Sequence, residues 1–160
     1  MARYLDVHPH DPQPRAIEQT AALLRDGALV AYPTDSCYAL GAAMGSHDAA
    51  DRIRRIRHLD ERHHFTLVCA DFAQVGQYVI LDNSAFRAIK AATPGPYTFI
   101  LPATKDVPRR LAHPRKRTVG VRIVDHPGTP YAGTAAYTSG RCTIAIAEAR
   151  ADDAALIAHE

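Results

Sequence analysis

The chain has 160 residues, of which 47% are hydrophobic, and its formal net charge is only +2. This size and composition are typical of one globular domain, and the charge is too small to mark a strongly basic nucleic-acid-binding protein. No apolar run reaches the roughly 18 residues that a membrane span needs, and the N-terminus lacks the apolar core of a signal peptide. The three cysteines are widely spaced, which favours reduced thiols. We therefore expect a cytoplasmic protein with no membrane partner.

The first half of the chain predicts helix, strand and helix. A helix is expected over 14–25, with Pro14 in its first turn and Asp26-Gly27 at its end. The apolar run 28–32 predicts a buried strand that ends near Tyr32, because proline cannot donate to a central ladder. A second helix is expected over about 47–58. Ser46 caps it, an apolar stripe runs along one side, and its arginines point outward; the stripe consists of Ala49, Ile53 and Ile56.

The second half predicts short helices between strands. Strands are expected over 65–69, 97–101 and 118–124. Asp71 is expected to cap a short helix that reaches Val75. Asn83 or Ser84 is expected to cap the next helix, which carries Phe86 and Ile89. The order lacks a regular βαβ rhythm, which favours an α+β or open mixed-sheet domain.

The strand 118–124 alternates with a period of two. Val119, Val121 and Ile123 therefore lie on one face, and Thr118 and Arg122 on the other. Such a polar pair is either the solvated side of a sheet or a hydroxyl and a guanidinium presented to a ligand.

Two clusters of basic residues stand out from a nearly neutral chain. They predict either one positive face or two ordinary solvated surfaces. The first is Arg52, Arg54, Arg55, Arg57, His58, Arg62, His63 and His64, and the second is Lys105, Arg109, Arg110, Arg115, Lys116 and Arg117.

Common catalytic motifs are absent from the sequence. It contains no P-loop, G-x-G-x-x-G, H-E-x-x-H or C-x-x-C. The pairs His8/His10 and His63/His64 lack a third ligand at convincing spacing, so no metal site is expected. Cys37 is either a nucleophile or a small buried thiol, and no partner histidine can be located from the sequence.

The stretch YPTDSCYALGA resembles the P-T-[ED]-[ST]-x-Y-x-L-G signature of the YrdC/YciO-like family. The resemblance continues in the same order through Ile56-Arg57, PGPYTFIL and TVGVRI, so it covers about residues 15–127. PTDS in place of PTET places the chain nearest the YciO branch. The resemblance implies an α+β fold, in which helices flank a twisted open mixed sheet with a concave basic cavity.

The family includes the threonylcarbamoyl-AMP synthases of tRNA t6A modification, which act without a covalent enzyme intermediate. The resemblance implies L-threonine, bicarbonate and ATP with Mg²⁺ as reactants, and no prosthetic group. It implies positioning and charge neutralisation rather than a catalytic side chain.

The resemblance also implies roles for individual residues. Thr34 and Arg122 match residues that bind the amino-acid substrate, with Arg122 holding its carboxylate. Arg57 and Thr118 match nucleotide-binding positions, and arginine at 57 keeps the charge of the family's lysine. Accessory phosphate or RNA contacts are expected from His63, Arg54 and Arg55. The charge of His63 near neutral pH is conditional, because an unperturbed histidine titrates at about 6.5.

The chain departs from the family pattern in two places. Leu59 stands where the synthases have an arginine, which removes one cation from the triphosphate site. From about residue 128 the pattern ends and no Ser-x-Asn motif follows. We therefore expect a family domain over 1–127 and a divergent or frameshifted tail over 128–160, so that the fold is truncated. A genuine tail predicts a weak strand over 142–147 and an Ala-rich helix over 150–159.

Three functions remain open from the sequence. The first is a threonylcarbamoyl-AMP synthase or a weak relative. The second is a module that binds double-stranded RNA or tRNA without turnover, and the third is a hydrolase that uses Cys37.

Overall fold

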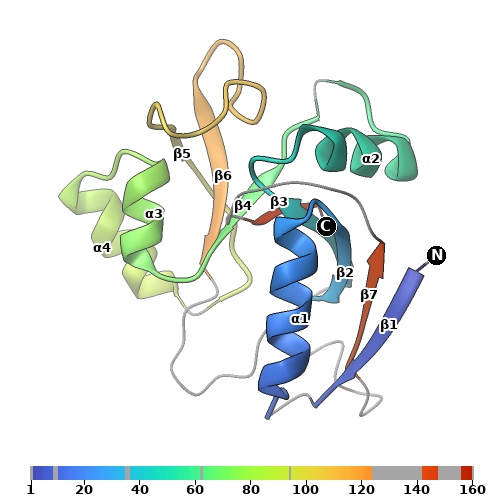
Figure 1. The fold of residues 1–160 in the computed structure, drawn as a ribbon. Coiled ribbons are helices and arrows are strands. Elements are labelled where there is room, and N and C mark those ends of the chain that lie inside the picture. Colours follow the sequence, from blue (N-terminus) through green and yellow to red (C-terminus); the bar gives the residue numbers. More distant parts are fainter. Residues whose placement is uncertain are drawn as a thin grey trace. The chain divides into compact units, whose positions relative to one another are not determined.

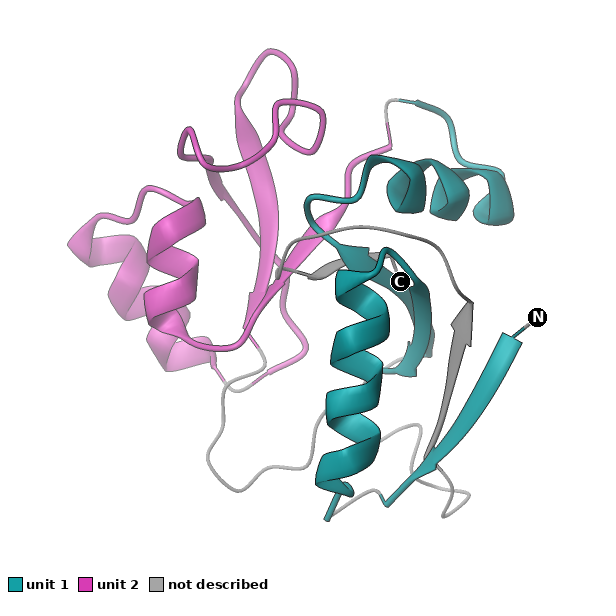
Figure 2. Ribbon diagram, viewed as in Figure 1, with its two compact units in different colours: residues 1–61, 128–160 teal, residues 62–127 magenta. Residues whose placement is uncertain are grey.

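The structure, a computed structural model, describes residues 2–8, 11–34, 37–61, 63–93, 95–123, 142–147 and 156–159. Figure 1 shows the chain as strands and helices that follow one another in mixed order. The chain divides into two compact units, which are coloured in Figure 2. Unit 1 comprises residues 1–61 and 128–160, and unit 2 comprises residues 62–127. Each unit is described by itself.

Unit 1 contains an antiparallel sheet whose strands run in the order β1-β7-β2-β3-β8. Its elements are β1 (Ala2–Val7), α1 (Pro14–Arg25), β2 (Leu29–Pro33), β3 (Tyr38–Ala43), α2 (His47–Arg57), β7 (Cys142–Ala147) and β8 (Leu156–His159). The strands β2 and β3 form a hairpin in which Val30 pairs with Gly41 and Pro33 with Tyr38.

The two helices of unit 1 contribute apolar side chains to its core. Leu23 and Leu24 of α1 pack against a cluster of Val7, Ala28 and Val30. Gly27 has φ 80°, a left-handed conformation that glycine adopts without a Cβ penalty, and it follows the end of α1 as expected. In α2 the buried residues are Ala49, Ala50 and Ile53.

Unit 2 contains the strand order β4-β6-β5, with β6 parallel to β4 and antiparallel to β5. Its elements are β4 (Thr66–Cys69), α3 (Phe72–Tyr78), α4 (Asn83–Ala92), β5 (Phe99–Pro102) and β6 (Thr118–Ile123). Along β6, Val119, Val121 and Ile123 are buried and the alternate residues are half-buried, as the period of two predicts. The largest fully buried side chains of this unit include Phe65, Leu67 and Leu111.

Most expected elements are confirmed, several with shifted ends. The helix 14–25 has the predicted bounds. Helix α3 is capped by Asp71 as expected, but it continues past Val75 to Tyr78. The cap of α4 was wrong by one residue: Asp82, one residue before Asn83, accepts the N–H of Ala85 at 2.7 Å. Asp82 precedes the first helical residue, which is where a side chain can reach the N–H groups of the first turn.

The expected stripe of α2 was wrong at one position, and β1 was not predicted. Ile56 is 55% exposed, whereas the buried residues of α2 are Ala49, Ala50 and Ile53. In the tail, the strand 142–147 is confirmed and lies between β1 and β2. The expected helix 150–159 was wrong over Leu156–His159, which pair with β3 as a strand, and 150–155 lie outside the described residues. Within the described part of the chain, none of the helices combines the length and apolarity needed to cross a membrane.

Candidate functional site

Thr34 lies at the end of β2 and closes the β2–β3 hairpin. Its side chain is buried, with 5% exposure. Its hydroxyl donates to the carbonyl of Cys37 at 2.7 Å and accepts the Cys37 N–H at 3.2 Å, while the Thr34 N–H donates to the same carbonyl at 2.8 Å. Residues 35 and 36, which the signature motif includes, lie outside the described residues. Thr34 therefore has a structural role in this turn beside any contact with a ligand.

The last turn of α2 carries three arginines in different situations. Arg54 donates to the carboxylate of Asp51 at 2.8 Å, and only 13% of its side chain is exposed. It therefore does not point outward as expected, since the ion pair holds it along the helix. Arg55 and Arg57 are exposed. Among these three residues, Arg57 is the one in the last helical position.

The end of α2 has a strained C-terminal residue. His58 adopts φ 52°, and the N–H of Leu59 donates to the carbonyl of Arg54 at 2.9 Å. This six-to-one bond is the Schellman arrangement, in which glycine is the usual residue at the left-handed position. Leu59, which stands where the synthases have arginine, follows as a half-buried residue.

The candidate residues of β6 lie on one face of the unit 2 sheet. Thr118 and Arg122 flank Gly120, and all three are half-buried. Gly120 pairs with Thr66 of β4 and with Ile100 of β5, and Ile100 is 75% exposed. A Cβ placed on Gly120 would lie 3.1 Å from Thr66 Oγ1 and 3.2 Å from Thr98 Cγ2. Because glycine has no side chain, no atoms project from the sheet between Thr118 and Arg122.

The histidines of unit 2 contact other rings. His63 is half-buried and meets Phe65 edge-on, with ring centroids 6.1 Å apart. His64 stacks at a tilt of 32° on His113, with centroids 5.0 Å apart. Within the described residues, no group of three or more histidine, cysteine, aspartate or glutamate side chains could hold a metal ion.

The cysteines differ in environment. Cys37 is exposed, so the alternative that it is a small buried thiol was wrong. Its Sγ donates to the carbonyl of Tyr38 at 3.7 Å. Cys69 is buried in β4, and burial together with the nearby Asp71 carboxylate raises the pKa of its thiol to about 11. A raised pKa disfavours the thiolate, which is the nucleophilic form, so Cys69 is the less reactive of the two.

The candidate residues are divided between the two units. Unit 1 holds Thr34, Arg54, Arg55 and Arg57, and unit 2 holds His63, Thr118 and Arg122. The structure brings Thr118 and Arg122 onto one face, and it places the three arginines of α2 in one helical turn. Convergence of all seven residues on one basic cavity stays a prediction. Gly120 was not among the expected site residues, although a glycine between two polar residues of one strand face is visible in the sequence.

Comparisons with known proteins agree in one family. The Sua5/yciO/yrdC family model, described as "Telomere recombination", matches residues 22–148. Escherichia coli YciO is 46% identical over 127 residues, which are 79% of this chain and 62% of that protein. A threonylcarbamoyl-AMP synthase of Halorhodospira halophila is 34% identical over 120 residues, covering 74% of this chain and 62% of the synthase. The chain thus spans about three-fifths of the length of these curated relatives.

Solved structures resemble the fold in the same way. The crystal structure of E. coli YciO matches with a TM-score of 0.70 and 41% identity, covering 86% of this chain and 66% of YciO. The crystal structure of P. abyssi Sua5 complexed with L-threonine matches with a TM-score of 0.65 and 30% identity, covering 72% of this chain and 34% of Sua5. The mixed α+β architecture expected from the sequence is therefore confirmed.

Proposed function

Since the chain belongs to the Sua5/YciO/YrdC family, we propose that it binds L-threonine and ATP in the manner of a threonylcarbamoyl-AMP synthase. The observation that carries this proposal is the face of β6, on which Thr118 and Arg122 flank a glycine. The complex of Sua5 with L-threonine, a 30% identical neighbour, supports an amino acid as one ligand.

Arg122 is the residue that recognises the amino-acid carboxylate. Its guanidinium offers two parallel N–H donors, a geometry that a carboxylate accepts in a bidentate pair. Thr34 meets the substrate as an acceptor, because its hydroxyl proton is given to the Cys37 carbonyl. An acceptor suits the α-ammonium group of threonine. Each of these side chains, taken by itself, thus suits one of the two charged groups that a free amino acid carries.

Arg57 and Thr118 serve the nucleotide. Arg57 is exposed, so its guanidinium can reach a phosphate. Arg54 is held by its ion pair with Asp51, so it acts on the phosphates through its electrostatic potential rather than by direct contact. Arg55 and His63 supply further accessory contacts with phosphate. Mg²⁺ enters with ATP as part of the substrate.

The reaction has two bond-forming steps. The α-ammonium of threonine first loses a proton to solvent; the resulting amine nitrogen attacks the carbon of bicarbonate, a C–O bond breaks, and the hydroxyl leaves as water with a proton from the nitrogen, so that N-carboxythreonine forms. An oxygen of the new carboxylate then attacks the α-phosphorus of ATP, the bond between that phosphorus and the bridging oxygen breaks, and pyrophosphate leaves with the electron pair. The chain acts by holding the reactants and neutralising phosphate charge, which is the main source of catalysis in phosphoryl transfer. Leu59 offers no charge to the triphosphate, so we expect slower turnover than in a chain with arginine there.

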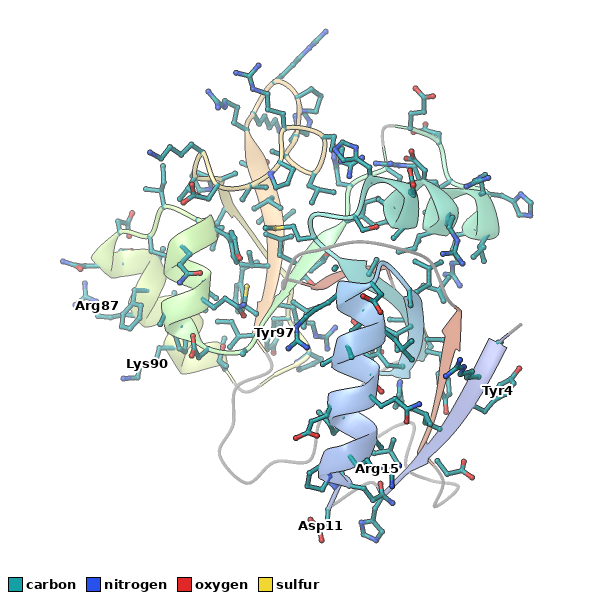
Figure 3. The ribbon with its side chains drawn as sticks, viewed as in Figure 1. Tyr4, Asp11, Arg15, Arg87, Lys90 and Tyr97 are labelled. Atoms are coloured by element: carbon teal, nitrogen blue, oxygen red, sulfur yellow. The ribbon has the colours of Figure 1, made fainter. Side chains whose placement is uncertain are left out.

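Isothermal titration with L-threonine and MgATP tests the proposal. We expect Arg122→Ala to weaken threonine binding by roughly tenfold or more, the loss of a charge-assisted hydrogen bond. Arg122→Lys should restore part of it, because lysine keeps the charge without the fork. The matched control is Arg87→Gln, which removes a cation from the outer side of α4 (Figure 3). Threonine binding that is equal in wild type and Arg122→Ala would contradict the assignment.

Activity is measured separately as release of pyrophosphate. It should require both threonine and bicarbonate, since the attacking group is made from both. Release with ATP alone would indicate simple hydrolysis and would count against the synthase reaction.

A second candidate function is RNA binding. The loop between β5 and β6 exposes several cations that can contact a phosphodiester backbone: Lys105, Arg109, Arg115, Lys116 and Arg117. Affinity for tRNA or a double-stranded RNA oligomer should then fall steeply as salt rises. A salt-independent affinity would exclude this mode.

A further inference from the structure

The loop between β5 and β6 surrounds a hollow of about 460 Å³ in unit 2. Its cationic lining comes from Arg109 and Arg117, His113 adds an imidazole, and its apolar lining includes Ala103, Val107 and Pro114. Among the described residues that line it, none carries a carboxylate. The volume falls within the range of roughly 300–1,000 Å³ that small-molecule sites occupy.

The imidazole of His113 is held in one orientation. Its Nδ1 accepts the backbone N–H groups of Arg115 at 3.2 Å and Lys116 at 3.1 Å. An accepting Nδ1 carries no proton, so the neutral ring bears its proton on Nε2. The ring also stacks on His64 at 5.0 Å. His113 is therefore a fixed hydrogen-bond donor in the lining of the hollow.

The backbone at Arg117 is held in a sparsely populated conformation. Its φ is 52°, which is uncommon outside glycine and costs about 1–2 kcal/mol. Its N–H donates to the carbonyl of His113, and its carbonyl accepts the N–H of Ala103, both at 2.8 Å. These bonds fix the start of the Arg117 side chain beside the hollow. Strain that the surrounding structure maintains in this way is typical of binding sites.

The loop is anchored to the core of unit 2. Leu111 is 1% exposed and Val107 is 4% exposed, and the N–H of His113 donates to the carbonyl of Thr118 at 2.7 Å. The hollow is therefore formed before a ligand arrives, which reduces the cost of ordering on binding.

We propose that this hollow binds a small organic phosphate. Two guanidinium groups and an imidazole N–H match the oxygens of a phosphate group, and the apolar wall accommodates the rest of the ligand. None of the seven residues assigned to threonine and ATP lines it. The inference thus goes beyond the proposed function and stands or fails independently of it.

The test is a titration of ¹⁵N-labelled protein with ADP, without Mg²⁺ or threonine, followed through backbone amide shifts. We expect shifts at 103–117 in the wild type. Arg109→Gln should weaken binding roughly tenfold, the loss of one charge-assisted hydrogen bond, and Arg117→Asn should do the same. Asparagine is chosen at 117 because it tolerates positive φ. Arg87→Gln, an equal loss of charge on α4, should leave the affinity unchanged.

Further probes separate the possible sources of phosphate. Inorganic phosphate should shift the same amides and bind more weakly than ADP, because it does not use the apolar wall. Equal affinity for inorganic phosphate and ADP would overturn the proposal that the apolar wall binds the organic part of the ligand. Binding of an RNA oligomer without any response to ADP at 103–117 would overturn the small-ligand assignment.

Two checks keep the test decisive. Arg122→Ala should leave the ADP shifts at 103–117 in place, so a failure of the threonine site and a failure of this site are distinguishable. If Arg117→Asn loses its dispersed spectrum, Arg109→Gln decides alone, because Arg109 is exposed and its replacement leaves the core intact. Affinity that is the same in Arg109→Gln and Arg87→Gln would overturn the proposal.

Discussion

Adding one methyl group to the face of β6 tests both the fold of unit 2 and the proposed site. In Gly120→Ala the new Cβ would lie 3.1 Å from Thr66 Oγ1, 3.2 Å from Thr98 Cγ2 and 3.7 Å from Thr66 Cα. The first two distances are a few tenths of an ångström below ordinary contact, so the threonine side chains must move. Overpacking of this kind costs about 1–3 kcal/mol of folding free energy. Alanine offsets about 0.5–1 kcal/mol of this, because it loses less backbone entropy on folding than glycine does. The side-chain ends can yield, so we expect a net loss of about 0.5–1 kcal/mol.

Gly76→Ala is the matched control, since it adds the same methyl group elsewhere in unit 2. Gly76 lies in α3, and apart from its chain neighbours and the adjacent helical backbone no atom lies within 4 Å of its added Cβ. Alanine there should stabilise the protein by about 0.5–1 kcal/mol, the difference in helix propensity. Urea unfolding followed by circular dichroism should therefore separate the two variants by about 1–2 kcal/mol at equal m-values. Equal stabilisation by both substitutions would refute the register of β6 between β4 and β5.

The same variant has a functional consequence. The methyl group of Gly120→Ala occupies the surface between Thr118 and Arg122. We expect threonine affinity to fall about tenfold, or about 1.4 kcal/mol, while Gly76→Ala binds as the wild type does. Unchanged threonine affinity in a folded Gly120→Ala protein would move the ligand away from this face.

Four further predictions concern caps and thiols. Asp82→Ala should lower the free energy of unfolding by about 1 kcal/mol, because the Ala85 N–H loses its acceptor, whereas Asp82→Asn should keep most of the cap; urea unfolding measures both. His58→Gly should raise the unfolding free energy by up to about 1 kcal/mol by relieving the left-handed residue, and His58→Ala should not. In a Cys142→Ser background at pH 8, a maleimide should label Cys37 in the native state and Cys69 only after unfolding. Because the pKa of Cys69 is raised from 9.0 to about 11, the folded state binds the thiol proton more tightly than the unfolded state does. The free energy of unfolding should therefore fall as pH rises from about 9 to 11. Cys69→Val should make this fall with pH less steep.

Local signals in the sequence were sufficient for most elements of the fold. Pro14 and Gly27 delimit α1, and Ser46 caps α2 by accepting the Ala49 N–H. These signals act within a few residues, so no tertiary information is needed to interpret them. The period of two in 118–123 likewise predicted which residues of β6 share a face, because strand geometry alone decides it.

Pairing between distant segments could not be obtained in this way. The alanine-rich segment near the C-terminus has helix propensity, yet Leu156–His159 pair with β3, since the ladder bonds outweigh local preference. The strand β1 is short and mostly exposed, and its partner β7 lies some 140 residues away in the sequence. The same limit applies to the site: Thr118 and Arg122 were placed together, whereas the two hydrogen bonds between the Thr34 hydroxyl and Cys37 depend on the conformation of the turn.

Hydrogen-bond accounting distinguishes the roles of Thr34 and Arg122. The Thr34 hydroxyl both donates to and accepts from the backbone of Cys37, so Thr34→Ala removes bonds that close the hairpin as well as any contact with substrate. A loss of threonine binding in that variant would follow equally from a collapsed turn. Arg122 is half-buried on the same face of β6 as Gly120, and its replacement by lysine keeps the charge while removing the planar fork. The comparison of alanine and lysine at position 122, rather than any variant of Thr34, therefore decides whether this face recognises a carboxylate.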